Sequence, residues 1–299
     1  MEEYVKKYLK AGRIASRVRE EALRIVKPGV KIIDVCEKLE GMIKELGGKP
    51  AFPVNVSINE IAAHYTSPIG DESVIPYPSL VKVDIGVHID GYIADTATTV
   101  VLSDDVRLHD LAQASQEALE KALKIVGVNV RIKDVGEVIE RTIKSFGFKP
   151  IKNLTGHSLD QYNLHSGVSI PNYGGLLIFG RFEHGRAYAI EPFATMGSGY
   201  VVDTKLETIF SILREDKVRG GIEKNIIEYV DKNHNGLPFA ERWLKSLGDV
   251  KEIRKAIKFL VKRGILRSYP VLTDSDNALV SQAEHTVLVL EGETIITTL

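Results

Sequence analysis

The feature that most constrains the fold is an internal repeat at a fixed offset of 100 residues. Residues 20–50 align without a gap over residues 120–150, and 16 of the 31 paired positions are identical. Each copy has the pattern of a helix, a short loop and a second helix, ended by a glycine and a proline. Similar helices share composition, but identical breakers at one offset indicate duplication. We therefore expect an α+β fold of two related halves, with a site between them.

The second helix of each copy carries two acidic residues three positions apart. Asp34 precedes Glu37, and Asp134 precedes Glu137 at the same offset. This spacing is typical of a capping box, in which the first residue is the N-cap and the second lies at position N3. The sequence thus predicts that these helices begin just after the two aspartates.

A β-hairpin is predicted at Asp90-Gly91, because this dipeptide separates the alternating strands LVKVDIGVHI and YIADTATTVV. In a two-residue turn Ile89 pairs with Tyr92, and each further pair is found by stepping back along both strands. The valines and isoleucines of the first strand then form one face, which we expect to lie in the core.

The same register places Asp84 and Asp95 on the opposite face as diagonal neighbours, roughly 7–8 Å apart at the backbone. Gly86 and Ala97 face them and leave space for something else. Two converging carboxylates repel unless a proton or cation intervenes, and oxygen ligands on rigid strands suit divalent metals. The alternative is a solvent-facing pair on an exposed edge.

Three further residues are candidates for the same site. His157 follows Gly156 in a place equivalent to the strands after the first repeat, while Glu191 ends one apolar strand and Glu284 opens another. A two-metal site that activates water needs about this many oxygen ligands and a histidine. Each residue alone is weak evidence, because strand ends often carry a solvated glutamate.

Charge balance and cysteine count exclude several classes of function. The chain has 39 basic and 40 acidic residues, which argues against binding DNA or an anionic membrane by bulk charge. A single cysteine, Cys36, excludes an internal disulfide, a zinc finger and an iron–sulfur framework. Residues 161–180 form the longest uncharged stretch, but its polar residues and glycines argue against a membrane span. Residues 1–10 do not resemble a signal peptide, so we expect a cytoplasmic protein.

Five separated segments agree in amino-acid sequence and in order with one known family. They are NEIAAHYTSPIGD, VDIGVHIDGYIADTATTV, NLTGHSLDQYNLHSGVSIP, AYAIEPFATMGSG and SQAEHTVLV. Through them the chain resembles type II methionine aminopeptidases, the archaeal form especially, over nearly its whole length. The resemblance implies a duplicated pita-bread fold around a dinuclear metal site. It places a catalytic domain at 1–210 and 270–299, and an inserted helical subdomain at 211–269.

The resemblance also implies a ligand set for two divalent ions, with cobalt, manganese, iron and zinc as candidates. Its members are Asp84, Asp95, His157, Glu191 and Glu284. By the family pattern Asp95 and Glu284 bridge the ions, Asp84 chelates one, and His157 and Glu191 complete the other. The ions activate a water, and Glu191 carries its proton as a catalytic residue.

His64 and His165 match the family's other catalytic positions, which contact the scissile amide and its carbonyl. By resemblance Phe52, Pro53 and Tyr269 help to line the pocket for the methionine side chain. The implied activity is removal of the initiator methionine from nascent proteins and peptides, with preference for a small second residue.

Two other functions of this fold stay open. Prolidases and aminopeptidases that cut before proline have equivalent ligands, but they usually carry a separate N-terminal domain, for which Asp84 comes too early. A non-catalytic binding relative would be expected to have lost ligands, whereas all seven positions match here. One departure is Ala283, where the family often has an aromatic residue.

Residues 220–268 change to a helical pattern, which indicates the inserted subdomain. One helical face there carries Lys251, Arg254, Lys255, Lys258 and Lys262. A solvated outer face is the favoured interpretation; the alternative is a ribosome contact through ribosomal RNA. The expected partner is the N-terminal methionine of nascent polypeptides, without DNA or membrane, and the protein is expected to act as a monomer.

Overall fold

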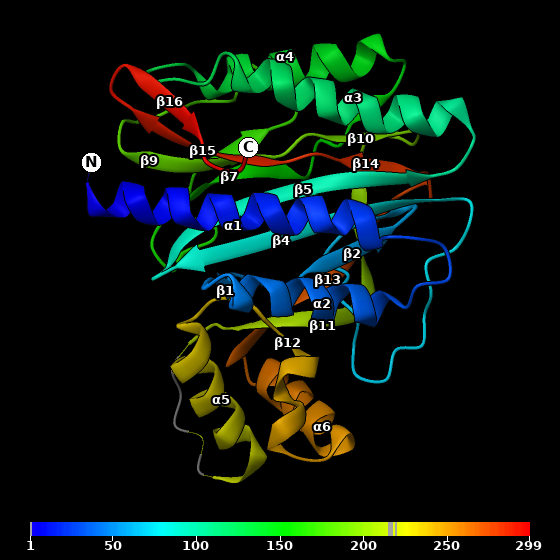
Figure 1. The fold of residues 1–299 in the computed structure, drawn as a ribbon, viewed down its shortest axis with the longest axis vertical. Helices are drawn as coiled ribbons and strands as arrows, with labels where there is room; N and C mark the ends of the chain where they lie inside the picture. Colours follow the sequence, from blue (N-terminus) through cyan, green and yellow to red (C-terminus); the bar gives the residue numbers. More distant parts are fainter. Residues whose placement is uncertain (1, 215–217, 219) are drawn as a thin grey trace.

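The computed structural model describes residues 2–214, 218 and 220–299 (Figure 1). Its helices are α1 (Glu3–Ile25), α2 (Ile32–Glu45), α3 (Val106–Leu123), α4 (Ile132–Ser145), α5 (Gly221–His234), the 3-10 helix η1 (Glu241–Leu247) and α6 (Val250–Lys262). Its strands are β1 (Lys49–Pro50), β2 (Asn55–Ile58), β3 (Ile61–Ala63), β4 (Ser79–Ile89), β5 (Tyr92–Leu102), β6 (Lys149–Pro150), β7 (Thr155–Leu159), β8 (Ser169–Pro171), β9 (Arg186–Ile190), β10 (Phe193–Thr195), β11 (Val201–Ile212), β12 (Phe239–Ala240), β13 (Leu266–Asp274), β14 (Val280–Gln282), β15 (His285–Leu290) and β16 (Glu293–Ile296).

The predicted duplication is confirmed by equivalent elements at the offset of 100. The bounds of α2 and α4 differ by 100 residues at both ends, and so do those of β1 and β6. Gly47 and Gly147 adopt a left-handed backbone just beyond the two helices, with φ of 79° and 82°. This conformation favours glycine and ends a helix, so the repeated breaker has the same structural role in both halves.

The capping-box prediction is wrong, because each helix begins three residues earlier, at Ile32 and Ile132. The Ile32 N–H donates to the carbonyl of Ser73 over 3.0 Å, and the Ile132 N–H donates to Gly180 over 3.2 Å. A neighbouring segment therefore satisfies the first helical N–H, which a capping side chain would otherwise do. Asp34 lies in the first turn, where its charge favours the positive end of the helix dipole.

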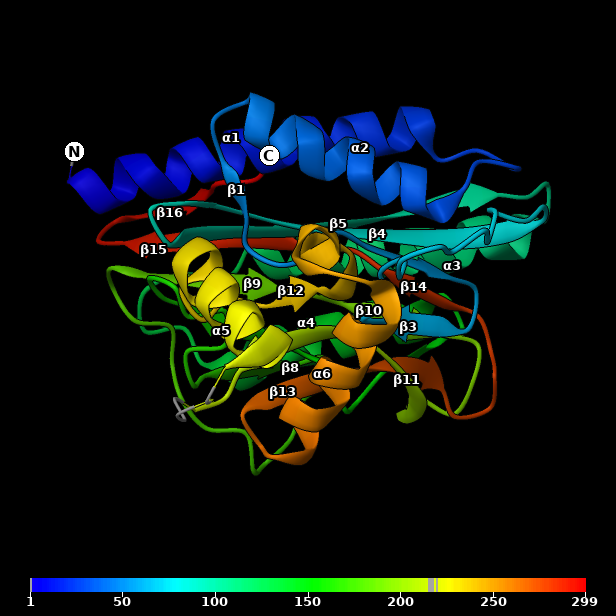
Figure 2. The same cartoon turned by 90° about the horizontal axis from the view of Figure 1, so that it is seen from below.

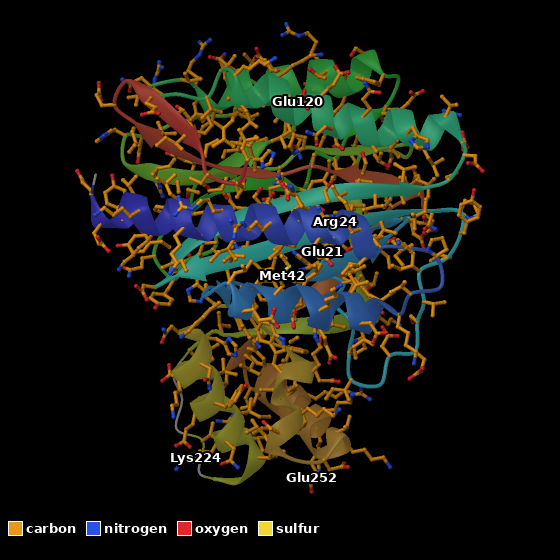
Figure 3. The ribbon with its side chains drawn as sticks, in the orientation of Figure 1. Glu21, Arg24, Met42, Glu120, Lys224 and Glu252 are labelled. Carbon is orange, nitrogen blue, oxygen red and sulfur yellow. The ribbon has the colours of Figure 1, made fainter. Side chains whose placement is uncertain are left out.

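In the first half, α1 and α2 cover one face of the sheet that contains β4 and β5 (Figure 2). The apolar face predicted for the first hairpin strand lies here: Val83, Ile85 and Val87 are buried against both helices. Cys36 of α2 is buried in the same core. Charged side chains such as Glu21 and Arg24 of α1 lie on the outer side (Figure 3).

In the second half, α3 and α4 pack together and cover the sheet of order β16-β15-β9-β7-β8. Ala283 is buried in this core, so a small residue fits where the family often has an aromatic one. The two halves meet where β5 runs beside the start of β15. The N–H of Glu284 donates to Ala97 over 3.1 Å, and the hydroxyl of Thr96 donates to the carbonyl of Glu284 over 2.8 Å.

Helices α5, η1 and α6 lie together at the end of the molecule away from α3 and α4 (Figure 1). They share a buried cluster with the ends of β11 and β13. Residues 215–217 and 219, inside the predicted insertion 211–269, lie outside the described residues. The boundaries of that insertion stay a prediction.

The predicted basic face of α6 is exposed, and Ile253, Ile257 and Leu260 are buried on its other side. Arg254 is different from the lysines, because its guanidinium binds Glu241 with an N–O distance of 2.9 Å. Among the helices of the described ranges, none is long and apolar enough to cross a membrane.

Candidate metal centre and catalytic cavity

The hairpin has the predicted register: Ile89 pairs with Tyr92, Gly86 with Asp95 and Asp84 with Ala97. Asp84 and Asp95 are therefore diagonal neighbours on one face. The space beside Gly86 has a different use from the one expected, because it holds the ring of Phe52. A Cβ at position 86 would lie 2.2 Å from Cε1 of that ring, so the glycine lets an apolar side chain pack beside the aspartates.

The second half supplies three more side chains. His157 lies on β7 and pairs in register with Ala189 of β9, and Glu191 follows the end of β9. Glu284 lies between β14 and β15, where its backbone is hydrogen bonded to β5. The five predicted ligands thus come from strands or strand ends of both halves, as expected for a site between repeats.

The side chains converge in two overlapping groups. Ligand atoms of Asp95, His157 and Glu284 lie within 4.8 Å of one another, and so do those of Asp84, Glu191 and Glu284. Glu284 belongs to both groups, as a bridging ligand would. The resemblance pairs Glu191 with His157, whereas this grouping places it with Asp84 and Glu284.

Burial and mutual repulsion shift the protonation of the whole cluster. Burial raises the pKa of Asp84 to about 7. The pKa values of Asp95, Glu191 and Glu284 lie well above the ordinary range, first because of burial and then because of the neighbouring carboxylates. Burial, with a contribution from His165, lowers the pKa of His157 to about 3. The cluster therefore lacks positive charge of its own at neutral pH.

The residues present fit divalent cations. Within the described part of the chain, Asp84 Oδ1, Asp95 Oδ1 and both carboxylate oxygens of Glu284 are buried without a hydrogen-bond partner. Buried polar atoms are normally paired, and unpaired carboxylate oxygens beside an imidazole are the donors that such ions take. The cluster is capable of binding metal.

The cluster opens into a cavity of about 230 Å³. Of the predicted substrate residues, His64, His165, Phe52 and Tyr269 line it. Pro53 is buried and does not line it; its carbonyl accepts a hydrogen bond from the amide of Asn55 over 2.8 Å.

Several polar residues of the site were not predicted from the sequence, among them Gln282 and Asn55. Gln282 donates from Nε2 to Glu191 Oε1 over 2.8 Å, and Asn55 lines the cavity opposite Asp84 across β2 and β4. Gln282 lies two positions before Glu284, so strand alternation was an available clue. The pairing of β2 with β4 has no local signature in the sequence.

Comparison with known proteins decides the family. A model of metallopeptidase family M24 matches residues 6–226. The chain belongs to this family. Methionine aminopeptidase of Thermococcus onnurineus is 45% identical over 292 residues, which cover 97% of this chain and 98% of that protein. Methionine aminopeptidase of Pyrococcus abyssi is also 45% identical, over 98% of this chain and 99% of that one.

Solved structures share the M24 fold. A thermophilic Arx1 aligns with a TM-score of 0.84 at 22% identity, covering 99% of this chain and 91% of that one. Methionine aminopeptidase of Thermotoga maritima aligns with a TM-score of 0.72 at 24% identity, over 100% and 97% of the two chains. Prolidase of Pyrococcus furiosus aligns with a TM-score of 0.63 at 18% identity, over 100% of this chain and 64% of that one.

In this M24 protein His64 is held in a left-handed backbone conformation, with φ of 67°. Such a backbone costs a residue with a Cβ about 1–3 kcal/mol, so its surroundings must maintain it. Its Nδ1 lies 3.1 Å from the carbonyl of Pro270, and its own carbonyl accepts a hydrogen bond from Thr208 over 3.3 Å. The ring of Tyr269 meets the imidazole edge-on, with centroids 5.9 Å apart.

A buried ion pair connects this segment to the helical region. Arg242 of η1 binds Glu40 of α2, and their side chains are 3% and 5% exposed. Glu40 also accepts the N–H of Val54 over 3.0 Å, and Arg242 donates to the hydroxyl of Thr66 over 2.6 Å. Thr66 in turn donates to the carbonyl of Val54 over 2.7 Å. The pair thus fixes the two segments that carry Phe52 and His64.

The raised pKa of Asp84 predicts a pH-dependent penalty in the metal-free protein. The folded state holds the Asp84 proton up to about pH 7, whereas the unfolded chain releases it near pH 4. Stability from this group is therefore present at low pH and is lost as the pH rises towards 7. Relative to wild type, Asp84→Asn should gain about 2 kcal/mol or more between pH 5 and pH 8.

Urea unfolding of both proteins in chelator at several pH values measures this difference. Subtraction removes the contribution of groups that titrate alike in both proteins, such as Lys82. The difference then reports Asp84 together with the neighbouring carboxylates whose pKa values it raises. A difference that stays constant, or that shrinks as the pH rises, would contradict the described electrostatics.

Proposed function

We propose that this protein removes the N-terminal methionine from peptides and nascent proteins by metal-dependent hydrolysis. The observation that carries the proposal is the convergence of four carboxylates and His157 at a largely apolar cavity. It is supported by relatives named methionine aminopeptidase that match at 45% identity over nearly the full length.

The proposed centre holds two divalent cations. Asp84, Asp95, Glu191 and Glu284 carry four negative charges when ionised, which two such cations balance. Asp84, Asp95, His157, Glu191 and Glu284 would hold the ions, and Glu284, which belongs to both groups of ligand atoms, would contact both. Cobalt, manganese, iron and zinc all accept these donors. When bound, the cations supply Lewis acidity and lower the pKa of the attacking water.

The remaining chemistry is assigned to side chains of the cavity. Glu191 holds the proton released by the attacking water, and Gln282 fixes one of its oxygens by a hydrogen bond of 2.8 Å. Burial lowers the pKa of His64, and burial followed by the neighbouring His64 lowers the pKa of His165 to about 4, so both imidazoles are neutral at pH 7.

A neutral His64 has a defined tautomer in this arrangement. Its Nδ1 faces the carbonyl of Pro270 at 3.1 Å, and a carbonyl only accepts, so Nδ1 carries the proton. Nε2 is then an acceptor, which suits the N–H of the scissile amide. His165, whose ring centroid lies 4.3 Å from that of His157, is assigned to the carbonyl oxygen of that amide.

The apolar wall fits an unbranched side chain without charge. Its members include Phe52, Leu164, Phe193, Ile209, Pro238 and Tyr269. A thioether gains from burial against such a surface, whereas a lysine or aspartate side chain would lose its hydration. Methionine is therefore the proposed first residue, and the preference for a small second residue is carried over from the family resemblance.

A peptide panel tests this function against the proline-directed alternative. Metal-stripped protein is assayed on Met-Ala-Ser, Met-Lys-Ser and Gly-Pro, with and without Mn²⁺ or Co²⁺. We expect metal-dependent methionine release from Met-Ala-Ser, at least tenfold slower release from Met-Lys-Ser, and no cleavage of Gly-Pro.

The control for the panel is Glu284→Gln, which keeps the shape of the bridging side chain and removes its charge. Its activity should fall by 100-fold or more, on the order of the effect of losing a metal-site contact. Preferential cleavage of Gly-Pro would assign the protein to the prolidase branch. No cleavage by folded, metal-loaded protein would favour the non-catalytic binding relative.

A ribosome contact, a cytoplasmic location and a monomeric state complete the proposal. Lys251, Lys255, Lys258 and Lys262 lie exposed on α6, where a polyanion such as ribosomal RNA would gain ion pairs that salt screens. Charge reversal of these lysines should abolish co-sedimentation with ribosomes at low salt. Binding that is equal in the wild type and the reversed variant would reject this contact. Arg254 is left unchanged because it already binds Glu241.

A further inference from the structure

The catalytic cavity continues into two outer depressions. One shares Leu164, His165, Pro238 and Tyr269 with the cavity and has a volume of about 210 Å³. The other lies on the side of His64, and its volume is about 610 Å³. A peptide whose first residue fills the cavity must leave through one of them, because an extended chain advances about 3.3–3.6 Å per residue.

The two depressions carry opposite charge. Among the described residues that line the smaller depression, Arg267 is the one with a full charge. Among the described residues that line the larger depression, Asp203 is the one with a full charge. Both side chains are exposed. The part of the peptide that extends out of the cavity therefore passes a cation, Arg267, on one route and an anion, Asp203, on the other.

Arg267 is available to a ligand. It lies on β13 opposite Ser211 of β11, and in the described part of the chain no ion pair joins it to a carboxylate. The hydroxyls of Ser211 and Tyr269 lie 3.1 Å apart beside it. The smaller depression thus combines a guanidinium with two hydroxyls. Because its volume is about 210 Å³ against about 610 Å³ for the larger depression, it holds a bound group closer to its polar side chains.

We propose that the depression formed by Arg267, Ser211 and Tyr269 binds the third residue of the substrate and favours a carboxylate there. The carboxylate comes from an acidic side chain at the third position or from the C-terminus of a tripeptide. The inference rests on the proposed function, because it assigns a specificity subsite to that reaction. An exposed charge pair changes affinity by up to about fivefold.

Tetrapeptide amides Met-Ala-X-Gly-NH2, with Asp, Asn or Lys as X, test whether the carboxylate of a third-residue side chain is bound. Comparison of Met-Ala-Ser with its C-terminal amide tests whether the C-terminal carboxylate of a tripeptide is bound. For wild type, kcat/KM should be about three- to fivefold higher for Asp than for Asn, and lowest for Lys. In Arg267→Gln the ratio of Asp to Asn should approach one, while Arg267→Lys should retain part of it. High salt should reduce the ratio in wild type.

Asp203→Asn is the matched control, since it removes one exposed charge from the other depression and should keep the wild-type ratio. The proposal is overturned if Arg267→Gln keeps the preference, or if Asp203→Asn is the variant that changes it. The Asn peptide carries no carboxylate at its third residue, so its cleavage by wild type tests the proposed function independently of the subsite. Failure to cleave that peptide would reject the function, and the subsite with it.

Discussion

Four carboxylates meet within a few ångströms in the interior of this protein, and their repulsion is the constraint that the rest of the structure serves. Buried like charges cannot all ionise without compensation, so the cluster must hold either protons or cations. The fold maintains it by joining two sheets at β5 and β15, where the side chains of Thr96 and Thr286 and the backbone of Glu284 form hydrogen bonds across the boundary between the repeats. Neither half contains the site alone.

The hairpin shows how far local sequence determines this geometry. Asp90 and Gly91 both adopt positive φ, 49° and 88°, which is the turn that matches strand twist. Once this turn is fixed, the period of two along each strand places Asp84 and Asp95 on one face. The repeat likewise predicts equivalent helices, because spacing and breakers lie within one segment. The contributions of His157, Glu191 and Glu284 could be inferred only weakly from their neighbours, and their roles came from resemblance.

What the sequence could not predict depends on contacts between distant segments. The start of α2 is set by the backbone of Ser73, the space beside Gly86 is filled by Phe52, and the segment carrying His64 depends on Arg242. The two partners of each contact lie between 34 and 176 residues apart in the sequence, so no local pattern predicts them. The buried pair of Arg242 and Glu40 also gives the helical region a structural role, because it supports two walls of the cavity.

If the carboxylate cluster is a metal centre, metal-free protein should bind Mn²⁺, and calorimetric titration measures that binding. Titrations at pH 7.5 in two buffers of different ionisation enthalpy give both the number of ions and the protons displaced. We expect two ions per chain with net proton release, because carboxylates with raised pKa values give up protons to cations. Absence of Mn²⁺ binding would contradict a metal centre at this cluster. So would Mn²⁺ binding that releases no protons and is unchanged in Glu284→Gln.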